Sequence, residues 1–238
     1  MLSLLLPILL LATPADAPGS GVVFVAGGAG SVINLPSLTR WALRQKSSPL
    51  EVREVAWSHG AARVIRDIQD IRHLAAHADQ LAVQIMAYQA QYPNRPIYLV
   101  GKSTGAMVVL LAAEQLPAGS LERIILLSPA VSPQYDLQPA LRSTKREIVS
   151  FRSSLDVPVL SWGTSLVGTA DRYYSKSAGL TGFAQPAPGT PAAAMYARLE
   201  EVAWGPSKML YGHLGGHLGN GMPLFLLFEV APYLTGTK

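Results

Sequence analysis

The sequence predicts an α/β fold in which a mostly parallel sheet carries helices on both faces. From about residue 21 onward, strand-like and helix-like stretches alternate, which is typical of parallel strands joined by helices. One apolar run, Ile97–Val100, leads through the glycine-rich turn Gly101–Gly105 directly into an apolar helix. The 238 residues, 49% of them hydrophobic, suffice for one well-buried domain and are too few for two comfortable ones.

The first half of the domain is predicted from short β-rich runs and one long periodic segment. Val22–Ala26 is an apolar run that ends at the glycines of Gly27–Gly30, and a short helix is expected at Leu35–Arg44. Glu51–Trp57 is the next expected strand. A helical region in one or two pieces is expected from Arg63 to Tyr92, because apolar side chains recur there every three or four residues.

The second half continues the alternation and then changes in texture. The expected elements are a helix at Thr104–Leu116, strands at Arg123–Leu127, Glu147–Arg152 and Lys208–Tyr211, and a closing helix at Pro223–Leu234. The connection from Ser161 to Ala192 is rich in Gly, Ala, Pro, Ser and Thr, and a connection of such length is typical of the rim of a functional site. Little sequence separates Leu127 from Glu147, so we expect no large cap domain.

The N-terminus predicts a secretory signal peptide at residues 1–17, with the α/β domain at residues 18–238. The apolar run Leu4–Ala12 is too short to span a bilayer, and Ala15–Ala17 after it is a small-x-small cleavage pattern. Neither Lys nor Arg precedes the run, and an uncleaved N-terminal anchor is the alternative. We expect an exported protein, periplasmic or extracellular, with no transmembrane segment in the mature chain.

The composition argues against several classes of function. Only 14% of the residues are charged, which argues against disorder. The net charge is +4, but the 19 Lys and Arg are scattered and form no basic patch, so we expect no nucleic-acid partner. Cysteine is absent, which excludes thiol catalysis and cysteine-ligated metals.

Two phosphate-binding interpretations of the glycines fail. Ile33 stands where a dinucleotide-binding loop needs its third glycine. Neither Pro96 nor Ile97 supplies the earlier glycine that a P-loop needs before its lysine. We therefore expect no cofactor.

Ser103 is the candidate nucleophile. It is the serine of a G-x-S-x-G sequence, Gly101–Gly105, between an apolar strand and a helix of small residues. Such a turn projects the hydroxyl from the end of the sheet, and the two glycines remove Cβ atoms that would collide there. An ordinary turn with a structural serine is the alternative. Lys102 is unusual at its position, and it either favours an anionic substrate or points into solvent.

A serine hydroxyl needs a base within hydrogen-bond reach and an acid that orients the base. In folds with this turn, the acid and then the histidine follow the serine along the chain. Two histidines follow Ser103, both in the sequence YGHLGGHLGNG. His217 is the favoured base because the glycines beside it allow close backbone approach, and His213 is the alternative. For metal binding, His73 and His77 lack a third ligand and are expected to be solvated helix residues.

Asp156 is the favoured acid because it directly follows a strand and so lies at the same edge of the sheet as Ser103. Asp171 is the main alternative, and Asp136 is the third.

Two backbone N–H groups are expected to form an oxyanion hole. One belongs to Thr104, the residue after the nucleophile, and the other to Gly28 in the loop after the first strand, with Gly27 as the alternative. His59, beside Gly60, is a candidate for the rim of this site.

In chain order, the early glycine loop, GKSTG, Asp156 and GGHLG resemble the α/β-hydrolase superfamily, and a small exported group of uncharacterised serine-hydrolase-like proteins within it. The resemblance covers essentially the whole mature chain. It implies a catalytic triad of Ser103, His217 and Asp156, and hydrolysis through an acyl-enzyme without a cofactor. The sequence departs from the pattern at Ala26, where many members carry a histidine before the first oxyanion glycine.

The expected function is therefore that of a serine hydrolase, esterase-like or lipase-like, with a small-molecule or lipid acyl ester as substrate. An acyltransferase or thioesterase that uses the same residues is the first alternative. A catalytically inactive hydrolase fold that serves as a binding module is the second.

Overall fold

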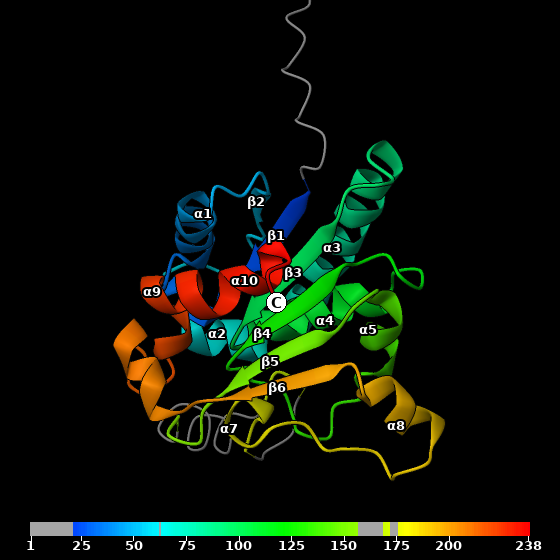
Figure 1. Ribbon diagram of the computed structural model, residues 1–238. Coiled ribbons are helices and arrows are strands. Elements are labelled where there is room, and N and C mark those ends of the chain that lie inside the picture. Colours follow the sequence, from blue (N-terminus) through cyan, green and yellow to red (C-terminus); the bar gives the residue numbers. More distant parts are fainter. Residues whose placement is uncertain (1–20, 62, 157–168, 172–175) are drawn as a thin grey trace, which may run out of the picture.

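The computed structural model describes residues 21–61, 63–156, 169–171 and 176–238 (Figure 1). The signal peptide expected at residues 1–17, and most of the first half of the connection expected from Ser161 to Ala192, lie outside the described residues. None of the helices in the described part of the chain combines the length and the apolar character needed to cross a bilayer.

The described residues form a six-stranded sheet in the order β2-β1-β3-β4-β5-β6, with every neighbouring pair parallel (Figure 1). The strands are β1 (Val22–Ala26), β2 (Glu51–Glu54), β3 (Ile97–Lys102), β4 (Arg123–Leu127), β5 (Ile148–Arg152) and β6 (Leu199–Ala203). Strands β1, β3 and β4 are buried along their whole length, because helices cover both faces of the sheet.

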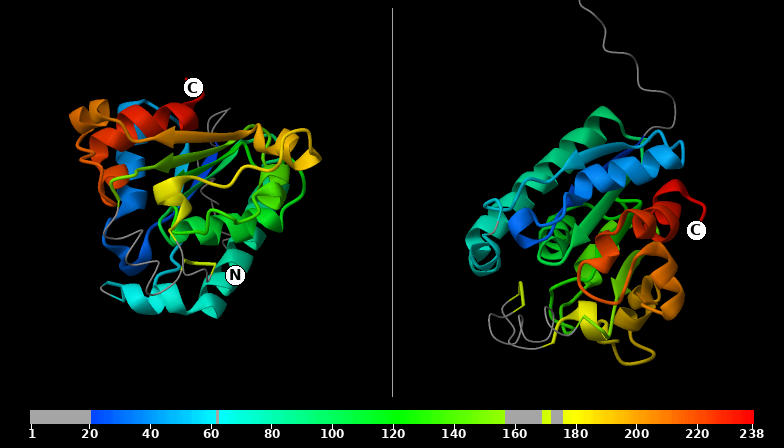
Figure 2. Two further views of the ribbon diagram at one scale, coloured as in Figure 1. Left: turned by 90° about the horizontal axis from the view of Figure 1, so that it is seen from below. Right: turned by 90° about the vertical axis from the view of Figure 1, so that its left-hand side faces the viewer.

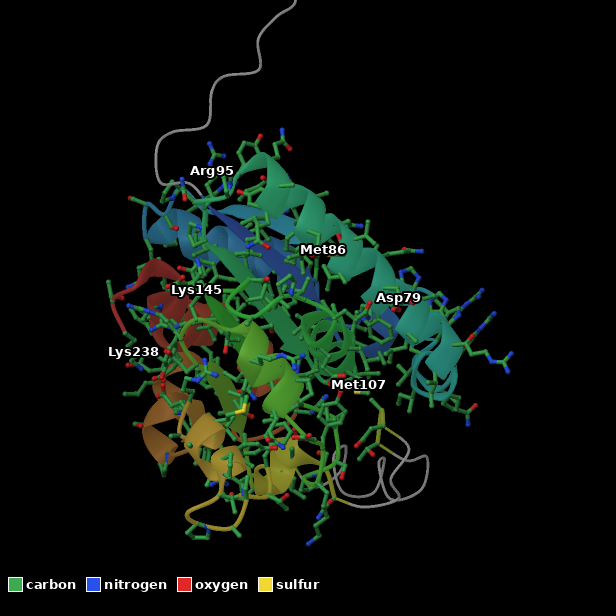
Figure 3. All side chains as sticks on the ribbon, turned by 90° about the vertical axis from the view of Figure 1, so that its right-hand side faces the viewer. Asp79, Met86, Arg95, Met107, Lys145 and Lys238 are labelled. Carbon is green, nitrogen blue, oxygen red and sulfur yellow. The ribbon has the colours of Figure 1, made fainter. Side chains whose placement is uncertain are left out.

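Helices pack on each face of the sheet, as the view from below shows (Figure 2). One face carries α3 (Ile71–Gln91), α4 (Gly105–Glu114), α5 (Gln138–Ser143) and α8 (Pro191–Tyr196). The other carries α1 (Leu35–Gln45), α9 (Pro223–Phe225), the π turn η5 (Leu226–Val230) and α10 (Ala231–Thr235). The long helix α3 lies at the outside of its layer, with the exposed side chains of Asp79 and Met86 on its surface (Figure 3).

Shorter helical segments connect these layers. They are η1 (Ala29–Ser31), α2 (Val64–Gln69), α7 (Ala178–Thr181), η3 (Pro206–Tyr211) and η4 (Gly219–Gly221). The expected helical region after residue 63 is in two pieces, α2 and α3. The break lies at Asp70, whose side chain caps α3 by accepting a hydrogen bond from His73 N at 3.0 Å.

The prediction of a last strand at Lys208–Tyr211 is wrong. This segment is the 3-10 helix η3, and its apolar side chains Met209 and Leu210 are exposed rather than packed on the sheet. The last strand is instead β6, a half-exposed edge strand. Its sequence LEEVA carries two glutamates, so it lacks the continuous apolar run that marks the central strands.

The topology creates a natural site for chemistry. The chain passes from β1 to β2 at one edge and then returns to β3 on the other side of β1. The carboxyl ends of β1 and β3 therefore meet where the strand order reverses, which is the usual ligand position in open parallel sheets. The glycine loop follows β1 and Ser103 follows β3, so both lie at this point.

Candidate active site

Ser103 occupies a strained turn between β3 and α4. Its φ angle is +53°, in the left-handed region that residues other than glycine seldom adopt. A Cβ atom on Gly101 would lie 2.7 Å from Ala106 Cα, and one on Gly105 would lie 2.2 Å from the carbonyl oxygen of Gly27. Both glycines of the G-x-S-x-G sequence are therefore required for helix α4 to pack this closely on the sheet, as expected.

The loop after β1 lies beside the serine. A Cβ atom on Gly28 would be 3.4 Å from Ser103 Cβ. Trp57 Nε1 donates a hydrogen bond to Gly27 O at 2.8 Å, and Asp67 Oδ2 accepts one from Gly30 N at 2.7 Å. The loop is thus fixed from outside, next to Ser103. The use of the Gly28 and Thr104 N–H groups as oxyanion donors stays a prediction.

A carboxylate and an imidazole from distant parts of the chain meet at the same edge. His217 Nδ1 lies 2.7 Å from Asp156 Oδ2, and Asp156 is fully buried. When Nδ1 carries the proton and faces Asp156, the lone pair of the His217 ring lies on Nε2. This is the tautomer that a general base needs. Burial is the main cause that lowers the pKa of His217, and the nearby Lys102 adds to it, whereas Asp156 opposes the shift. The imidazole is therefore neutral at neutral pH.

The loop that carries His217 is tied to the ends of three neighbouring strands. Lys102 Nζ, at the end of β3, donates to His217 O at 2.7 Å. Asn220 Nδ2 donates to Ser128 Oγ, just after β4, at 2.6 Å. Ser153 Oγ, just after β5, donates to Gly215 O at 2.6 Å. Since Lys102 directly precedes Ser103, this anchoring ties the His217 loop to the strand that leads into the candidate nucleophile. The hydrogen bond between His217 Nε2 and Ser103 Oγ stays a prediction.

The alternative base, His213, lies inside its own loop. It is 1% exposed, and its Nδ1 accepts a hydrogen bond from Gly215 N at 3.0 Å. A Cβ atom on Gly219 would lie 2.0 Å from that nitrogen, so the loop closes tightly around the ring. Burial lowers the pKa of His213 to about 4. This environment indicates a structural residue.

The alternative acids accept hydrogen bonds from backbone groups of the segment after β4. Asp171 Oδ1 accepts a hydrogen bond from Ser132 N at 2.8 Å. Asp136 is exposed and accepts one from Gln138 N at 3.0 Å, at the start of α5. Of the three candidates, Asp156 is the one that the structure pairs with a histidine.

The early histidines form a cluster that the sequence did not indicate. The rings of His59 and His73 stack at 3.8 Å between centroids, and those of His73 and His77 meet edge to face at 4.4 Å. His73 Nε2 lies 2.6 Å from Trp57 O, so the expectation of solvated helix residues is wrong for His73. Within the described ranges, no three His, Asp or Glu side chains are grouped as metal ligands.

Sequence reasoning also missed Asp67, on α2. Its carboxylate is 1% exposed and accepts hydrogen bonds from Gly30 N, Ser58 Oγ and His59 N, the last at 2.8 Å. Burial works to raise the pKa of this carboxyl, but the three hydrogen-bonding residues outweigh it and lower the pKa. His59 therefore acts on the glycine loop through Asp67. A single aspartate on a short helix carries no sequence signal for such a role.

A pocket of about 180 Å³ opens beside the glycine loop. Its walls combine apolar side chains with hydroxyl, amide and carboxylate groups, and they are formed by Gly27, Gly28, Ser31, Ile33, Asn34, Pro36, Glu54, Val55, Ala56, Trp57 and Ser58. Ser103 itself does not line the pocket, which reaches the serine only through Gly28.

The parallel sheet, the strained serine and the carboxylate–imidazole pair are those of an α/β hydrolase, so the expected fold class is confirmed. A family model described as serine aminopeptidase, S33, matches residues 19–178. Since this is more than half of the sequence, the chain belongs to that family of α/β hydrolases. It is accordingly a hydrolase, and the expectation of a serine hydrolase agrees with the family. Among curated proteins, none matches the sequence.

Several solved structures share the fold. LpqC, a poly(3-hydroxybutyrate) depolymerase from Bordetella parapertussis, is 13% identical with a TM-score of 0.54, over 94% of this chain and 83% of that one. TT1662 from Thermus thermophilus is 13% identical with a TM-score of 0.50, over 91% and 88%. A cutinase from Trichoderma reesei is 22% identical with a TM-score of 0.36; the match spans 46% of this chain and about half (52%) of the cutinase. At 13% identity, the likenesses to LpqC and TT1662 show the fold alone, and the partial cutinase match does not show even that.

Proposed function

We propose that the protein hydrolyses carboxylic esters through an acyl-enzyme formed on Ser103. The observation that carries the proposal is the 2.7 Å contact between His217 Nδ1 and Asp156 Oδ2, on a loop tied to the residue before Ser103. An imidazole that is buried, neutral and oriented by a carboxylate is the base that a serine hydroxyl needs.

In the proposed reaction, Ser103 Oγ attacks the ester carbonyl while His217 Nε2 accepts its proton. Asp156 stabilises the imidazolium, and the N–H groups of Thr104 and Gly28 donate to the oxyanion. His217 then returns the proton to the leaving alcohol, which departs. A water molecule, deprotonated by the same imidazole, attacks the acyl-enzyme carbonyl. The bond to Ser103 Oγ then breaks, His217 returns the proton to Oγ, and the acid leaves.

A fluorophosphonate probe and a series of p-nitrophenyl esters of increasing chain length test this proposal. The wild type is expected to be labelled and to turn over the esters, whereas Ser103→Ala is expected to lose labelling and at least about 1,000-fold in turnover. Equal labelling of both proteins would contradict the role of Ser103. Absence of labelling and turnover in the wild type would favour an inactive binding module. Products formed with added alcohols would favour an acyltransferase, and faster turnover of thioesters a thioesterase.

The family description supports a second candidate, the release of an N-terminal residue from a peptide by the same nucleophile. Such a substrate carries a free ammonium group, and Glu54 lines the pocket beside Gly28 as a carboxylate that can face it. Turnover of aminoacyl p-nitroanilides in preference to simple esters, and its loss in Glu54→Gln, would favour this candidate.

We also propose that the protein is exported. The apolar run before Ala15–Ala17 supports this proposal. N-terminal sequencing of the protein recovered outside the cytoplasm is expected to begin at residue 18, and recovery of the uncleaved chain from membranes would favour an anchor.

A further inference from the structure

Lys102 is a buried cation that the proposed reaction does not use. It is 3% exposed, although an ammonium group is costly to remove from water. Burial lowers the pKa of Lys102 to about 8, and the charge of Asp156 opposes this shift. Of the two interpretations made from the sequence, the solvent-facing side chain is wrong because Lys102 is buried, and the preference for an anionic substrate stays a prediction.

The ammonium group of Lys102 reaches the loop of the proposed base. Its Nζ donates to the backbone oxygen of His217 at 2.7 Å. A Cβ atom on Gly221, in the same loop, would lie 3.6 Å from Lys102 Cε, so the lysine side chain runs beneath the loop. The loop contains four glycines between positions 215 and 221 and would otherwise adopt many conformations.

The charges around His217 come from two strands and from its own loop. Asp156, after β5, pairs with the imidazole and favours its protonated form, whereas Lys102, at the end of β3, disfavours it. His213, in the same loop, is neutral at neutral pH because burial lowers its pKa to about 4. Lys208, on η3, influences His213 and is not among the causes that shift His217.

We infer that Lys102 is a positioning residue that holds the backbone of His217 beside Ser103, and that its charge keeps the imidazole unprotonated in mildly acidic solution. This inference rests on the proposed function. The two effects come from one group because the hydrogen bond to the carbonyl places the ammonium close to the ring. A base that stays neutral at lower pH extends activity toward acid, and its imidazolium is a stronger acid for the leaving alcohol.

The test compares Lys102→Gln and Lys102→Met with the wild type, using p-nitrophenyl butyrate from pH 5 to pH 9. Both variants lack the charge, so the acidic limb of the pH profile of kcat/KM, where activity falls as His217 takes up a proton, is expected to move to higher pH in both. Lys102→Met also lacks the hydrogen bond and is expected to lose about tenfold in kcat at pH 8. Lys102→Gln keeps a donor and is expected to lose less at that pH.

Lys208→Met is the matched control. Lys208 is also a buried lysine, and its Nζ donates to the backbone oxygen of Ala203 at 2.9 Å. Its removal is expected to lower stability while the acidic limb stays where it is in the wild type. A shift of the same size in this control would mean that general loss of packing, and not the charge beside His217, moves the limb, and would overturn the inference.

A direct titration of the His217 ring by NMR separates this inference from the proposed function, because it needs no substrate. The ring is expected to take up its proton at higher pH in Lys102→Gln than in the wild type. An unchanged titration and an unchanged pH profile would overturn the inference, even if the wild type cleaves esters. Conversely, a shifted titration in a protein that cleaves no ester would support the inference about Lys102 and contradict the proposed substrate class. If Lys102→Met does not fold, Lys102→Gln carries both measurements.

Discussion

Ser103 occupies a backbone conformation that a serine does not adopt without support from its surroundings. The support is steric: helix α4 packs so closely on the sheet that Gly101 and Gly105 have no room for a Cβ atom. The contact of Gly101 is with Ala106 in the following helix, whereas that of Gly105 is with Gly27 O in the distant loop after β1. The sequence therefore predicted the turn from its G-x-S-x-G pattern and not from these contacts. Lys102 lies between the same glycines, but its side chain points inward because it binds the His217 loop. The sequence therefore left the direction of this side chain open.

The buried histidine of the same site links stability to pH. Burial lowers the pKa of His213 from 6.5 to about 4, so between these values the unfolded chain binds a proton that the folded protein excludes. Stability is therefore lost as the pH falls through this range and is retained above it. Between pH 7.5 and pH 5, the free energy of unfolding is expected to fall by about 2 kcal/mol more in the wild type than in His213→Asn, whose side chain can still accept from Gly215 N. Urea unfolding at the two pH values measures this difference, and an equal loss in both proteins would contradict it.

At the scale of the elements, the loop after β1 is supported by α2 and by the chain after β2. Asp67 on α2 accepts from Gly30 N, and Trp57 donates to Gly27 O, so both ends of the loop are held. His59 and His73 pack against these groups in turn. Such support is what a predicted oxyanion donor requires, because its N–H must be oriented before the charge develops.

Asp67→Asn tests whether this support serves the site. The amide has one acceptor oxygen and cannot replace both carboxylate oxygens in the hydrogen bonds to Gly30, Ser58 and His59, so the loop is expected to loosen. We expect kcat for p-nitrophenyl butyrate to fall about 10- to 100-fold, with a smaller change in KM.

Asp70→Asn is the control for this variant, because Asp70 caps α3 and belongs to the same helix junction. It is expected to retain kcat within about twofold, since asparagine still caps α3 and the carboxylate of Asp70, apart from this cap, contacts His59 Nε2 at 3.6 Å and not the loop. Equal losses in the two variants would mean that the junction as a whole, and not the bond to Gly30, supports the loop.

At the scale of the whole molecule, the C-terminal end of the chain packs at the amino ends of the strands, opposite to the site. Arg123 begins β4, is 4% exposed, and forms an ion pair with Glu147 at the start of β5. Its guanidinium donates to Tyr233 O at 2.5 Å and to Lys238 O at 2.7 Å, which ties α10 to the sheet. Lys145 and Lys238 lie on this side of the molecule (Figure 3).

Arg123→Met is expected to lower the free energy of unfolding by about 3 kcal/mol, because a buried and paired carboxylate and two carbonyl groups lose their partner. The activity of the folded fraction is expected to stay the same, since Arg123 lies at the opposite ends of the strands from Ser103. Arg146→Met removes an exposed arginine paired with Glu122 and is expected to change stability by no more than about 0.5 kcal/mol. Thermal and urea unfolding of the three proteins measure the difference, and an unchanged Arg123→Met would contradict this account of the C-terminus.

The sequence by itself determined the fold class, most of the strands, and the order of serine, acid and histidine along the chain. These features are local: apolar runs mark buried strands, and glycines mark turns that admit no Cβ atom. The error in predicting the last strand also had local causes. Strand β6 carries glutamates at a half-exposed edge, and the apolar stretch of η3 faces solvent.

Only the tertiary structure decided which groups meet. Asp156 pairs with His217, Lys102 turns toward the His217 loop, and Asp67 supports the loop after β1. These contacts join segments separated by 37 to 115 positions. The burial of His213 inside its own loop also became clear only in the structure. The long-range contacts follow from the strand order and from the packing of loops over the carboxyl ends of β3, β4 and β5. No periodicity along the chain encodes them, because each depends on where the sheet brings two distant residues together.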